Sequence, residues 1–219
     1  MEKVFIGVPV RDTKGYSIEK YLESVKALEW DNIEFVMIDN SDTDILTKII
    51  ETKLVDKKID VVSMADKEMK SEVILLPDMM GRESEARLAL SREYFREMFL
   101  KSDAVYWLSW ECDIILPPDA LKVLIGILQT NQVDIVNCYY PDRDEKFKSV
   151  SGIGCSLFTR KCLETVSFMD NGAYGYCDSL IPNCYYGGDS WFMRQLERAK
   201  FKMLDLHNIL EIQHLGDLD

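Results

Sequence analysis

The sequence lacks the features that mark nucleic-acid-binding and membrane-spanning proteins. It has 26 lysine and arginine residues against 38 aspartate and glutamate residues, which gives a formal net charge of −12. Binding to a phosphate backbone needs a basic surface, so we expect no nucleic-acid partner. No apolar run reaches the roughly 18 uninterrupted residues of a membrane-spanning helix. The chain begins directly with a strand pattern, without a signal peptide, so we expect a cytoplasmic protein with no transmembrane segment.

Two further absences concern cysteine and histidine. None of the six cysteines belongs to a C-x-x-C pair, which argues against a zinc knuckle. Because cytosolic conditions keep thiols reduced, free thiols are the expectation. Only two histidines are present, His207 and His214. Internal repeats and low-complexity tracts are also missing, so the chain reads as an ordinary globular sequence with 47% hydrophobic and 29% charged residues.

Alternating strand and helix patterns are present along the chain. At 219 residues the chain suits one domain with a sizeable core. A strand–helix–strand–helix opening predicts parallel strands joined by right-handed crossovers. We expect strands at 3–10, 33–38, 59–63, 73–76, around 107 and at 134–140. We expect helices at 17–29, from about 42 to 53, and at 82–100, 120–129 and 189–200. A short strand and helix are expected at 152–160, and two short strands carrying both histidines at 201–215.

An acidic tripeptide, Glu111-Cys112-Asp113, follows the aromatic strand around residue 107 and precedes a Pro-Pro pair. In open α/β sheets, ligands bind at the carboxyl ends of the strands. Alternate residues of a strand share a face, so Glu111 and Asp113 are expected to point the same way. Two adjacent carboxylates repel unless a cation lies between them, which predicts a site for a hard divalent metal. The alternative is a solvated acidic turn before a helix.

Five other residues are candidates, each with a structural alternative. Asp39 ends the second strand and could accept a hydrogen bond from a base or ribose, or it could belong to the cap of the next helix. Arg82 and Arg87 could bind phosphates, although salt bridges to nearby carboxylates are the commoner fate of such arginines. His214 is either a ligand or a packed residue. Asp189 follows two glycines and could simply cap a helix.

The ordered series of motifs resembles a glycosyltransferase of the GT-A fold, of a family-two-like type. The stretch over 106–138 is also similar to the mannosyltransferases of mannan polymerase complexes. The resemblance covers nearly the whole chain and rests on six segments: Val4–Arg11, Glu34–Asp44, Tyr106–Leu121, Gly152–Arg160, Gly188–Leu196 and Ile212–Gly216.

The resemblance implies an α/β fold, a Rossmann-like and mostly parallel mixed sheet flanked by helices. It implies one domain over 1–219, with a nucleotide-binding part at 1–113 and an acceptor-binding part at 114–219. The partners it implies are a nucleoside-diphosphate sugar donor and a saccharide, protein or lipid acceptor. Whether the chain forms a homo-oligomer is left open. The residues that it implies for the nucleotide pocket are Pro9, Val10, Arg11 and Asp39.

In that family a D-x-D tripeptide holds Mn²⁺ or Mg²⁺ against the donor diphosphate. By resemblance, Asp113 and Glu111 take this role here, with a glutamate in place of the first aspartate. His214 matches a C-terminal histidine that completes the metal shell. Arg87 is similar to the arginine of an A-R-N-like segment, with Leu88 in place of the asparagine.

The resemblance also implies a mechanism. Asp189 matches the catalytic base of the inverting members, with Gly188 in place of the preceding glutamate. As the base, Asp189 would accept the proton of the attacking acceptor hydroxyl.

Two other functions remain under consideration. A nucleotidyltransferase acting on sugar phosphates would need a Gly-rich phosphate loop after the first strand, and Gly7-Val-Pro-Val-Arg-Asp is poor in glycine. A non-catalytic sugar- or nucleotide-binding module would tolerate the loss of Asp113 and Asp189. The presence of both aspartates favours an enzyme.

Overall fold

A computed structural model describes residues 1–41, 46, 48, 50, 59–63, 83–141, 152–168 and 188–216. The strand expected at 73–76 and Arg82 lie outside the described residues, as does most of the helix expected from 42 to 53. Four cysteines of the described part are free thiols, as expected: Cys112, Cys138, Cys155 and Cys162.

Seven strands form the main sheet of the described residues, in the order β3-β2-β1-β4-β7-β6-β8. Neighbouring strands run parallel except at β7, which is antiparallel to both β4 and β6. The predicted mostly parallel mixed sheet is therefore confirmed. A second, two-stranded sheet pairs β5 with β9. The strands are β1 (Val4–Val10), β2 (Ile33–Asp39), β3 (Ile59–Ser63), β4 (Tyr106–Trp110), β5 (Ile114–Ile115), β6 (Ile135–Cys138), β7 (Cys155–Thr159), β8 (Met203–Leu206) and β9 (Gln213–His214).

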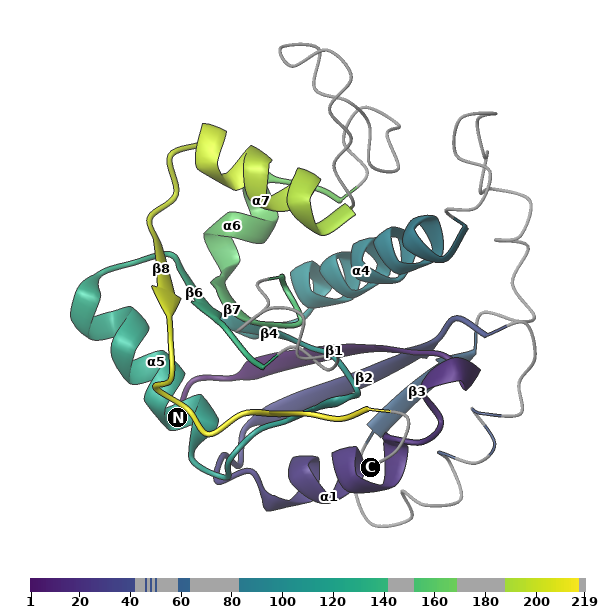
Figure 1. The fold of residues 1–219 in the computed structure, drawn as a ribbon. Coiled ribbons are helices and arrows are strands. Elements are labelled where there is room, and N and C mark those ends of the chain that lie inside the picture. Colours follow the sequence, from purple (N-terminus) through teal and green to yellow (C-terminus); the bar gives the residue numbers. More distant parts are fainter. Residues whose placement is uncertain are drawn as a thin grey trace.

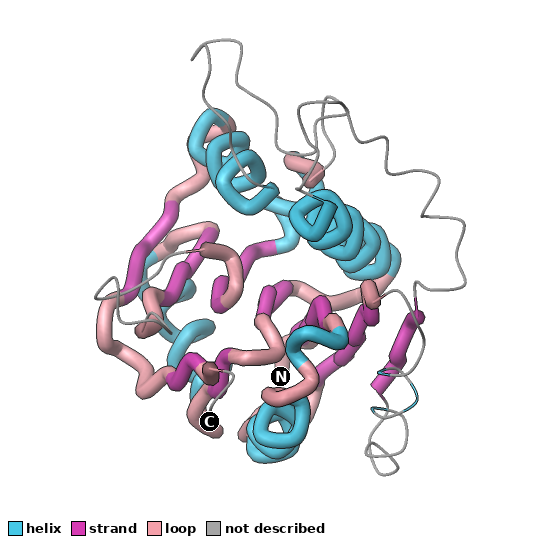
Figure 2. The backbone as a smooth tube through the Cα atoms, turned by 45° about the vertical axis from the view of Figure 1, so that its right-hand side comes forward, coloured by secondary structure: helices cyan, strands magenta, loops and turns pink. Residues whose placement is uncertain are grey.

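Helices cover both faces of the sheet, as Figure 1 shows, and Figure 2 presents the same layers in a rotated view. One buried cluster joins the sheet to α1 and α5, and a second joins the opposite face to α4, α6 and α7. Among the described helices, none combines the length and apolar character that crossing a bilayer requires. The helices are α1 (Ile18–Ala27), α4 (Glu83–Lys101), α5 (Ala120–Asn131), α6 (Arg160–Thr165) and α7 (Gly188–Arg198), with a 3₁₀ turn, η1 (Asp12–Lys14), after β1.

The central strand β1 contributes to both layers because its side chains alternate between the two faces. Val4 and Ile6 belong to the α1–α5 cluster, whereas Phe5 belongs to the α4–α7 cluster. Gly7 allows α4 to lie close to the strand, since a methyl group there would be 2.7 Å from Cγ of Phe95. The sheet and α4 are thereby held at a fixed separation, and α4 carries residues that reach the site.

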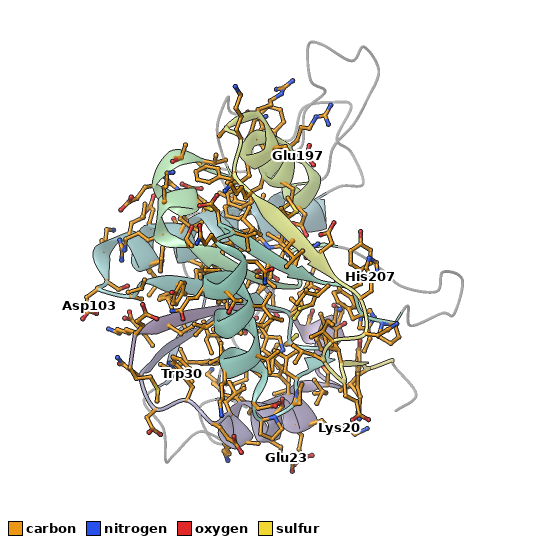
Figure 3. All side chains as sticks on the ribbon, turned by 90° about the vertical axis from the view of Figure 1, so that its left-hand side faces the viewer. Lys20, Glu23, Trp30, Asp103, Glu197 and His207 are labelled. Carbon is orange, nitrogen blue, oxygen red and sulfur yellow. The ribbon has the colours of Figure 1, made fainter. Side chains whose placement is uncertain are left out.

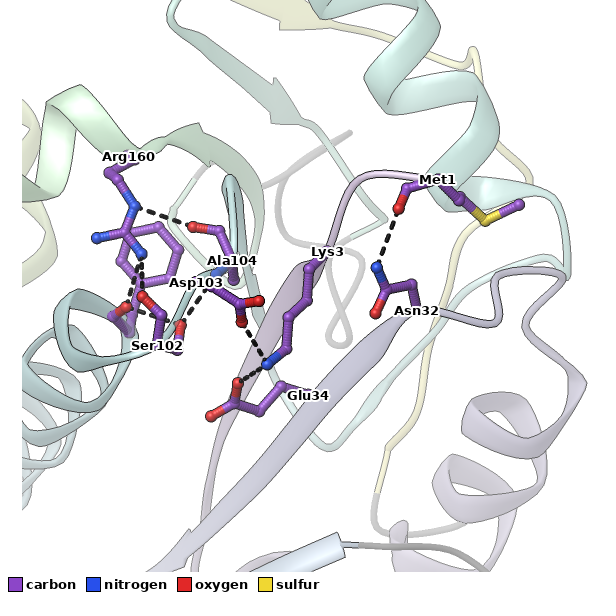
Figure 4. A network of polar contacts seen from close by, with 9 residues as sticks. Met1, Lys3, Asn32, Glu34, Ser102, Asp103, Ala104 and Arg160 are labelled. Atoms are coloured by element: carbon purple, nitrogen blue, oxygen red, sulfur yellow. Dashed lines mark hydrogen bonds and ion pairs between the residues drawn. The ribbon is translucent and has the colours of Figure 1, made fainter.

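A polar network lies at the amino ends of β1, β2 and β4 (Figure 4). Nζ of Lys3 is 2.7 Å from both Glu34 Oε2 and Asp103 Oδ1. The Arg160 guanidinium donates to the backbone carbonyls of Ala104 and Ser102, at 3.0 and 2.7 Å. These contacts join neighbouring elements at the edge of the sheet away from the candidate site.

The opposite edge gathers the carboxyl ends of six described strands. Strands β1, β2, β3 and β4 are parallel, and β6 and β8 share their direction because β7 is antiparallel to both β4 and β6. This is the edge at which open α/β sheets bind ligands. One expectation is wrong here: β4 ends at Trp110, so Glu111 and Asp113 lie in the turn after the strand and do not share a strand face.

Candidate functional site

A cavity of about 230 Å³ lies at the carboxyl edge, where β1, β2 and β4 end. It joins the end of the first strand to the acidic turn, two segments about 100 residues apart in the sequence. Both cationic and anionic side chains reach its wall. The lining residues are Pro9, Val10, Arg11, Thr13, Lys14, Asn40, Leu88, Glu111, Cys112 and Asp113.

The acidic turn is held by hydrogen bonds on both sides. The Glu111 amide donates to the Gly154 carbonyl at 2.8 Å, and the Ile114 amide donates to the Glu111 carbonyl at 3.1 Å. Trp110 Nε1 donates to the Ile114 carbonyl at 2.7 Å. The side chains of Glu111 and Asp113 contact different partners.

Asp113 is fully buried and lies among two basic side chains. Its Oδ2 contacts the Lys14 ammonium and is 3.5 Å from Nε2 of His214. The short β5–β9 pairing sets Ile114 opposite His214, and the Leu215 amide donates to the Asp113 carbonyl at 2.8 Å. The fold therefore brings His214 beside the acidic turn, and the metal role that the resemblance implies for it stays a prediction.

The His214 ring is oriented by its second nitrogen. Nδ1 lies 2.9 Å from the carbonyl oxygen of Pro141, and the ring meets Tyr140 edge-on at a centroid distance of 5.1 Å. A carbonyl oxygen only accepts hydrogen bonds, so Nδ1 must be the donor. In the neutral imidazole, Nε2 then directs its lone pair at Asp113. A second hydrogen bond of this kind is the usual way in which proteins orient a histidine that binds a metal.

Glu111 pairs with Arg92, a residue that sequence reasoning missed. Arg92 lies on α4 with only 1% of its side chain exposed, and its Nη2 is 3.2 Å from Glu111 Oε1. Its Nη1 forms an ion pair with Oδ1 of Asp189, at the start of α7. Burial lowers the pKa of Arg92 to about 10, while the nearby Glu111 charge opposes that shift. Arg92 is therefore still a cation at neutral pH, held between two carboxylates.

Glycines at positions 152 and 154 leave room for these groups. A methyl group on Gly154 would lie 2.8 Å from Tyr140 Oη and 3.0 Å from Glu111 Cδ. One on Gly152 would lie 3.7 Å from the same phenol oxygen and 3.8 Å from Asp189 Oδ2. The Tyr140 hydroxyl and the two carboxylates thus border the same pair of glycines. Its pKa is raised, mainly by burial and also by the Glu111 charge, so it stays a neutral phenol.

The predicted three-residue metal set is only partly assembled. Within the described part of the chain, no three His, Cys, Asp or Glu side chains are grouped closely enough to hold a metal ion. Glu111 is directed to Arg92 because β4 ends before it, and this is a correction to its expected role. Asp113 and His214 do converge, and a carboxylate with an imidazole suits Mn²⁺ as a partial ligand set that a diphosphate could complete.

Asp39 does not line the cavity. It is buried at the end of β2, and its Oδ1 accepts a hydrogen bond of 3.0 Å from the Ser41 amide. The next residue, Asn40, lines the cavity instead, because successive side chains of an extended segment point to opposite sides. Asn40 rather than Asp39 is therefore a lining residue of this cavity, and the nucleotide role expected of Asp39 stays a prediction.

Cys112 is a cavity residue without the properties of a nucleophile. Burial raises the pKa of its thiol to about 12, and the neighbouring Asp113 charge acts in the same direction. The reactive form of cysteine is the thiolate, which is absent at neutral pH under these conditions. Thiol-based catalysis is therefore not part of this site.

A second and larger cavity, of about 750 Å³, lies where β6 and β8 end. We call it the β6–β8 groove. The rings of Tyr139 and His207 lie against each other within it at a centroid distance of 4.0 Å, and Figure 3 shows His207 at the molecular surface. Its lining residues are Tyr139, Tyr140, Pro141, His207, Asn208, Ile209, Leu210, Glu211 and Ile212.

Comparisons with known proteins give matches in structure alone. No protein-family model matches the chain, and no curated protein matches it in sequence. The mannosyltransferase PcManGT from Pyrobaculum calidifontis, in complex with GDP-Man and Mn²⁺, superposes with a TM-score of 0.60 at 14% identity. The match covers 95% of this chain and 55% of the PcManGT chain. The S. aureus TarS fragment 1–349, in complex with UDP-GlcNAc, superposes with a TM-score of 0.62 at 12% identity. This match covers 98% of this chain and 60% of the TarS fragment.

The chain has the fold of these glycosyltransferases. The expected GT-A fold is thereby confirmed. At this level of identity the likeness establishes the fold alone. The chain also spans little more than half the length of PcManGT and TarS.

Two site residues, Arg92 and Lys14, were not predicted from the sequence. Only Arg92 lies in a sequence pattern that indicates its role. Arg92 carried a signal, since it shares a helical face with the apolar residues Leu88, Phe95 and Phe99 at spacings of four, three and four. An arginine on such a face has a buried partner. Lys14 carried none, because it lies in a polar turn. Arg87 lies in α4, but its side chain is outside the described residues.

Proposed function

We propose that the protein is a glycosyltransferase that moves a sugar from a nucleoside-diphosphate sugar to an acceptor hydroxyl. One observation carries the proposal: the cavity at the carboxyl edge combines the cations Arg11 and Lys14 with the carboxylates Glu111 and Asp113. An open α/β sheet binds its ligand at that edge. PcManGT and TarS, which share the fold, were solved with GDP-Man and UDP-GlcNAc.

Residues 1–113 form the donor side in this proposal. The Arg11 guanidinium and the Lys14 ammonium provide positive charge for a diphosphate inside a chain whose net charge is −12. Pro9, Val10 and Asn40 supply an apolar wall and an amide for the nucleoside. A local pair of cations is needed because the molecule as a whole repels an anionic donor.

Asp113 and His214 would hold a divalent cation, Mn²⁺ or Mg²⁺. When bound, such an ion neutralises the diphosphate and stabilises it as a leaving group. Asp113 contributes a fully buried carboxylate, and His214 contributes Nε2, oriented through the Pro141 carbonyl. Glu111 acts instead by pairing with Arg92, which keeps the acidic turn next to α4.

Asp189 is the proposed base of an inverting transfer. Oδ1 faces Arg92, and Oδ2 lies 3.8 Å from the place that a methyl group on Gly152 would take. With 27% of its side chain exposed, the carboxylate is accessible to an acceptor. It would take the proton of the attacking hydroxyl as that oxygen approaches the sugar from the face opposite the diphosphate. Arg92 fixes the direction in which Asp189 presents its second oxygen.

Residues 114–219 form the acceptor side, and the β6–β8 groove supports this division. Tyr140 lines the groove, and its hydroxyl and Asp189 Oδ2 both border Gly152, so an acceptor bound along the groove would end near the proposed base. The exposed rings of Tyr139 and His207 suit the C–H face of a sugar ring, and Asn208 and Glu211 suit its hydroxyl groups. We therefore propose a saccharide-bearing acceptor.

Asp189→Asn tests the catalytic proposal against a non-catalytic binding module. The donor sugar is first identified by screening nucleoside-diphosphate sugars for release of the nucleoside diphosphate. Loss of a general base is expected to lower the turnover of that donor by about 10²–10⁴-fold. The Kd for the nucleoside diphosphate should stay within about threefold, because Asp189 is not among the residues that line the donor cavity.

The control for this experiment is Asp31→Asn, which changes an exposed aspartate before β2 and should alter neither quantity. Turnover that survives Asp189→Asn would remove Asp189 as the base. A wild-type protein that binds donors and turns over none of them, even with saccharide acceptors present, would identify a binding module.

A further inference from the structure

Lys14, which the proposed function places beside the donor diphosphate, already has an anionic partner in this structure. It ends the η1 turn between β1 and α1, and its backbone is fixed on both sides. The Lys14 amide donates to the Arg11 carbonyl at 2.8 Å, and Ser17 Oγ donates to the Lys14 carbonyl at 2.8 Å. Its side chain, 27% exposed, reaches across the cavity to Oδ2 of the buried Asp113. The backbone is therefore anchored, and only the side chain has freedom to change partner.

The ammonium of Lys14 places positive charge beside Asp113 and His214. Asp113 Oδ2 and His214 Nε2 face each other at 3.5 Å. Because Nδ1 donates to the Pro141 carbonyl, a neutral His214 presents a lone pair to a carboxylate oxygen that also carries lone pairs. A positive charge beside two such acceptors offsets their repulsion. Lys14 supplies this charge at the position where Asp113 and His214 would bind a divalent cation.

We propose that Lys14 is a donor-binding residue that exchanges partners. In the free protein its ammonium pairs with Asp113, and in the donor complex it moves to the diphosphate while Asp113 and His214 take a divalent cation. The inference rests on the proposed function. Lys14, Arg11 and Asp113 all line the same cavity, so a diphosphate bound there is within reach of the side chain without movement of the backbone. A lysine suits this role because its stem is flexible and its ammonium bonds in any direction.

This exchange predicts that the metal and the nucleotide bind cooperatively. A divalent cation alone must displace Lys14 from Asp113 and leaves the ammonium with no new anionic partner. A nucleoside diphosphate alone must draw Lys14 away from a buried carboxylate. When both bind, the diphosphate gives Lys14 a new anionic partner, and the cation takes the place of Lys14 beside Asp113. By linkage, each ligand therefore raises the affinity of the other by the same factor.

The experiment compares the full-length wild-type protein with Lys14→Met by calorimetry. Three quantities are measured: the Kd of Mn²⁺ alone, the Kd of GDP or UDP in EDTA, and the Kd of the same nucleotide with Mn²⁺. The variant should bind Mn²⁺ alone about tenfold more tightly, because its competitor is gone. It should bind the nucleotide about tenfold more weakly, since one charge-assisted contact is lost. The factor by which Mn²⁺ raises the nucleotide affinity should therefore be smaller in the variant than in the wild-type protein.

Two further variants keep the result interpretable. Lys122→Met makes the same substitution at an exposed position of α5 and should leave all three constants unchanged. Lys14→Arg keeps the charge and should retain most of the nucleotide affinity, which separates a charge effect from a folding defect.

An Mn²⁺ affinity that Lys14→Met leaves unchanged or weakens would overturn the exchange. So would a nucleotide affinity that does not respond to the substitution. If the wild-type protein binds no nucleoside diphosphate with or without Mn²⁺, the proposed function fails and the exchange fails with it. Nucleotide binding that is indifferent to Lys14 overturns the exchange alone.

Discussion

At the scale of single residues, the site consists of cations and carboxylates in contact. Lys14 meets Asp113, and Arg92 meets both Glu111 and Asp189. A buried charge is costly unless it is paired. Arg92 is the more buried of the two cations and contacts both segments, so the geometry of the turn after β4 and of the start of α7 depends on it.

Replacing Arg92 should therefore destabilise the protein strongly. Arg92→Met leaves Glu111 and Asp189 without their shared cation and is expected to lower the free energy of unfolding by about 3–5 kcal/mol. Denaturant-induced unfolding, monitored by fluorescence of the tryptophans, measures this change. Arg194→Met removes an exposed arginine that pairs with Glu197 at 3.3 Å and should cost less than about 1 kcal/mol. Equal effects of the two substitutions would show that the buried network does not hold the site together.

At the scale of elements, hydrophobic periodicity predicted most of the described fold. Strand β3 lies at the residues expected, and β1, β2, α1 and α4 differ from the expected ranges by at most two residues at either end. The two-residue strand β5 was not predicted, because two residues are too few to show a pattern. Strands β8 and β9 lie within the range expected for two short strands, although His207 follows β8. The early end of β4 was missed because Glu111 directly follows a strand that is apolar and aromatic except for Ser109, without any turn residue between them.

Contacts between distant elements were harder to predict than the elements themselves. Lys14 and Asp113 are 99 residues apart, and Arg92 and Glu111 are 19 apart. The sequence alone does not show which turn faces which strand end. His214 could be placed beside Asp113 only because the ordered motifs resemble those of GT-A enzymes. The same resemblance matched Arg87 to the arginine of the A-R-N-like segment. It did not indicate Arg92, which lies about one and a half helical turns later and contacts Glu111.

The ends of β6 and β8 give a prediction at this scale. Tyr139 follows β6, and His207 follows β8, so the ring pair exists because the two strands are parallel neighbours. Tyr139→Ala or His207→Ala should raise the KM for a saccharide acceptor about three- to tenfold, the range expected for one aromatic contact. The Kd of the nucleoside diphosphate should not change, because neither residue lines the donor cavity. Steady-state kinetics and calorimetry measure the two quantities. A weaker nucleotide affinity with an unchanged acceptor KM would place the groove on the donor side.

At the scale of the whole molecule, the sheet has two parts that meet at β4 and β7. The parallel strands β3-β2-β1-β4 end at the cavity with Arg11 and Lys14, and β6 and β8 end at the groove with Tyr139 and His207. Asp113, Glu111 and Asp189 lie between the two. A donor on one side and an acceptor on the other would therefore meet beside the carboxylate that we propose as the base.

The central claim is that the cavity binds a nucleoside diphosphate with the help of Asp113. The most direct measurement is the thermal unfolding of the wild-type protein and Asp113→Asn with a panel of nucleoside diphosphates, each with and without Mn²⁺. At a ligand concentration of 100 times Kd, binding should stabilise the wild-type protein by about 2.7 kcal/mol. We predict that one member of the panel does so, that Mn²⁺ increases its effect, and that Asp113→Asn abolishes this increase. A panel with no effect on the wild-type protein, or an equal response to Mn²⁺ in Asp113→Asn, would contradict the account.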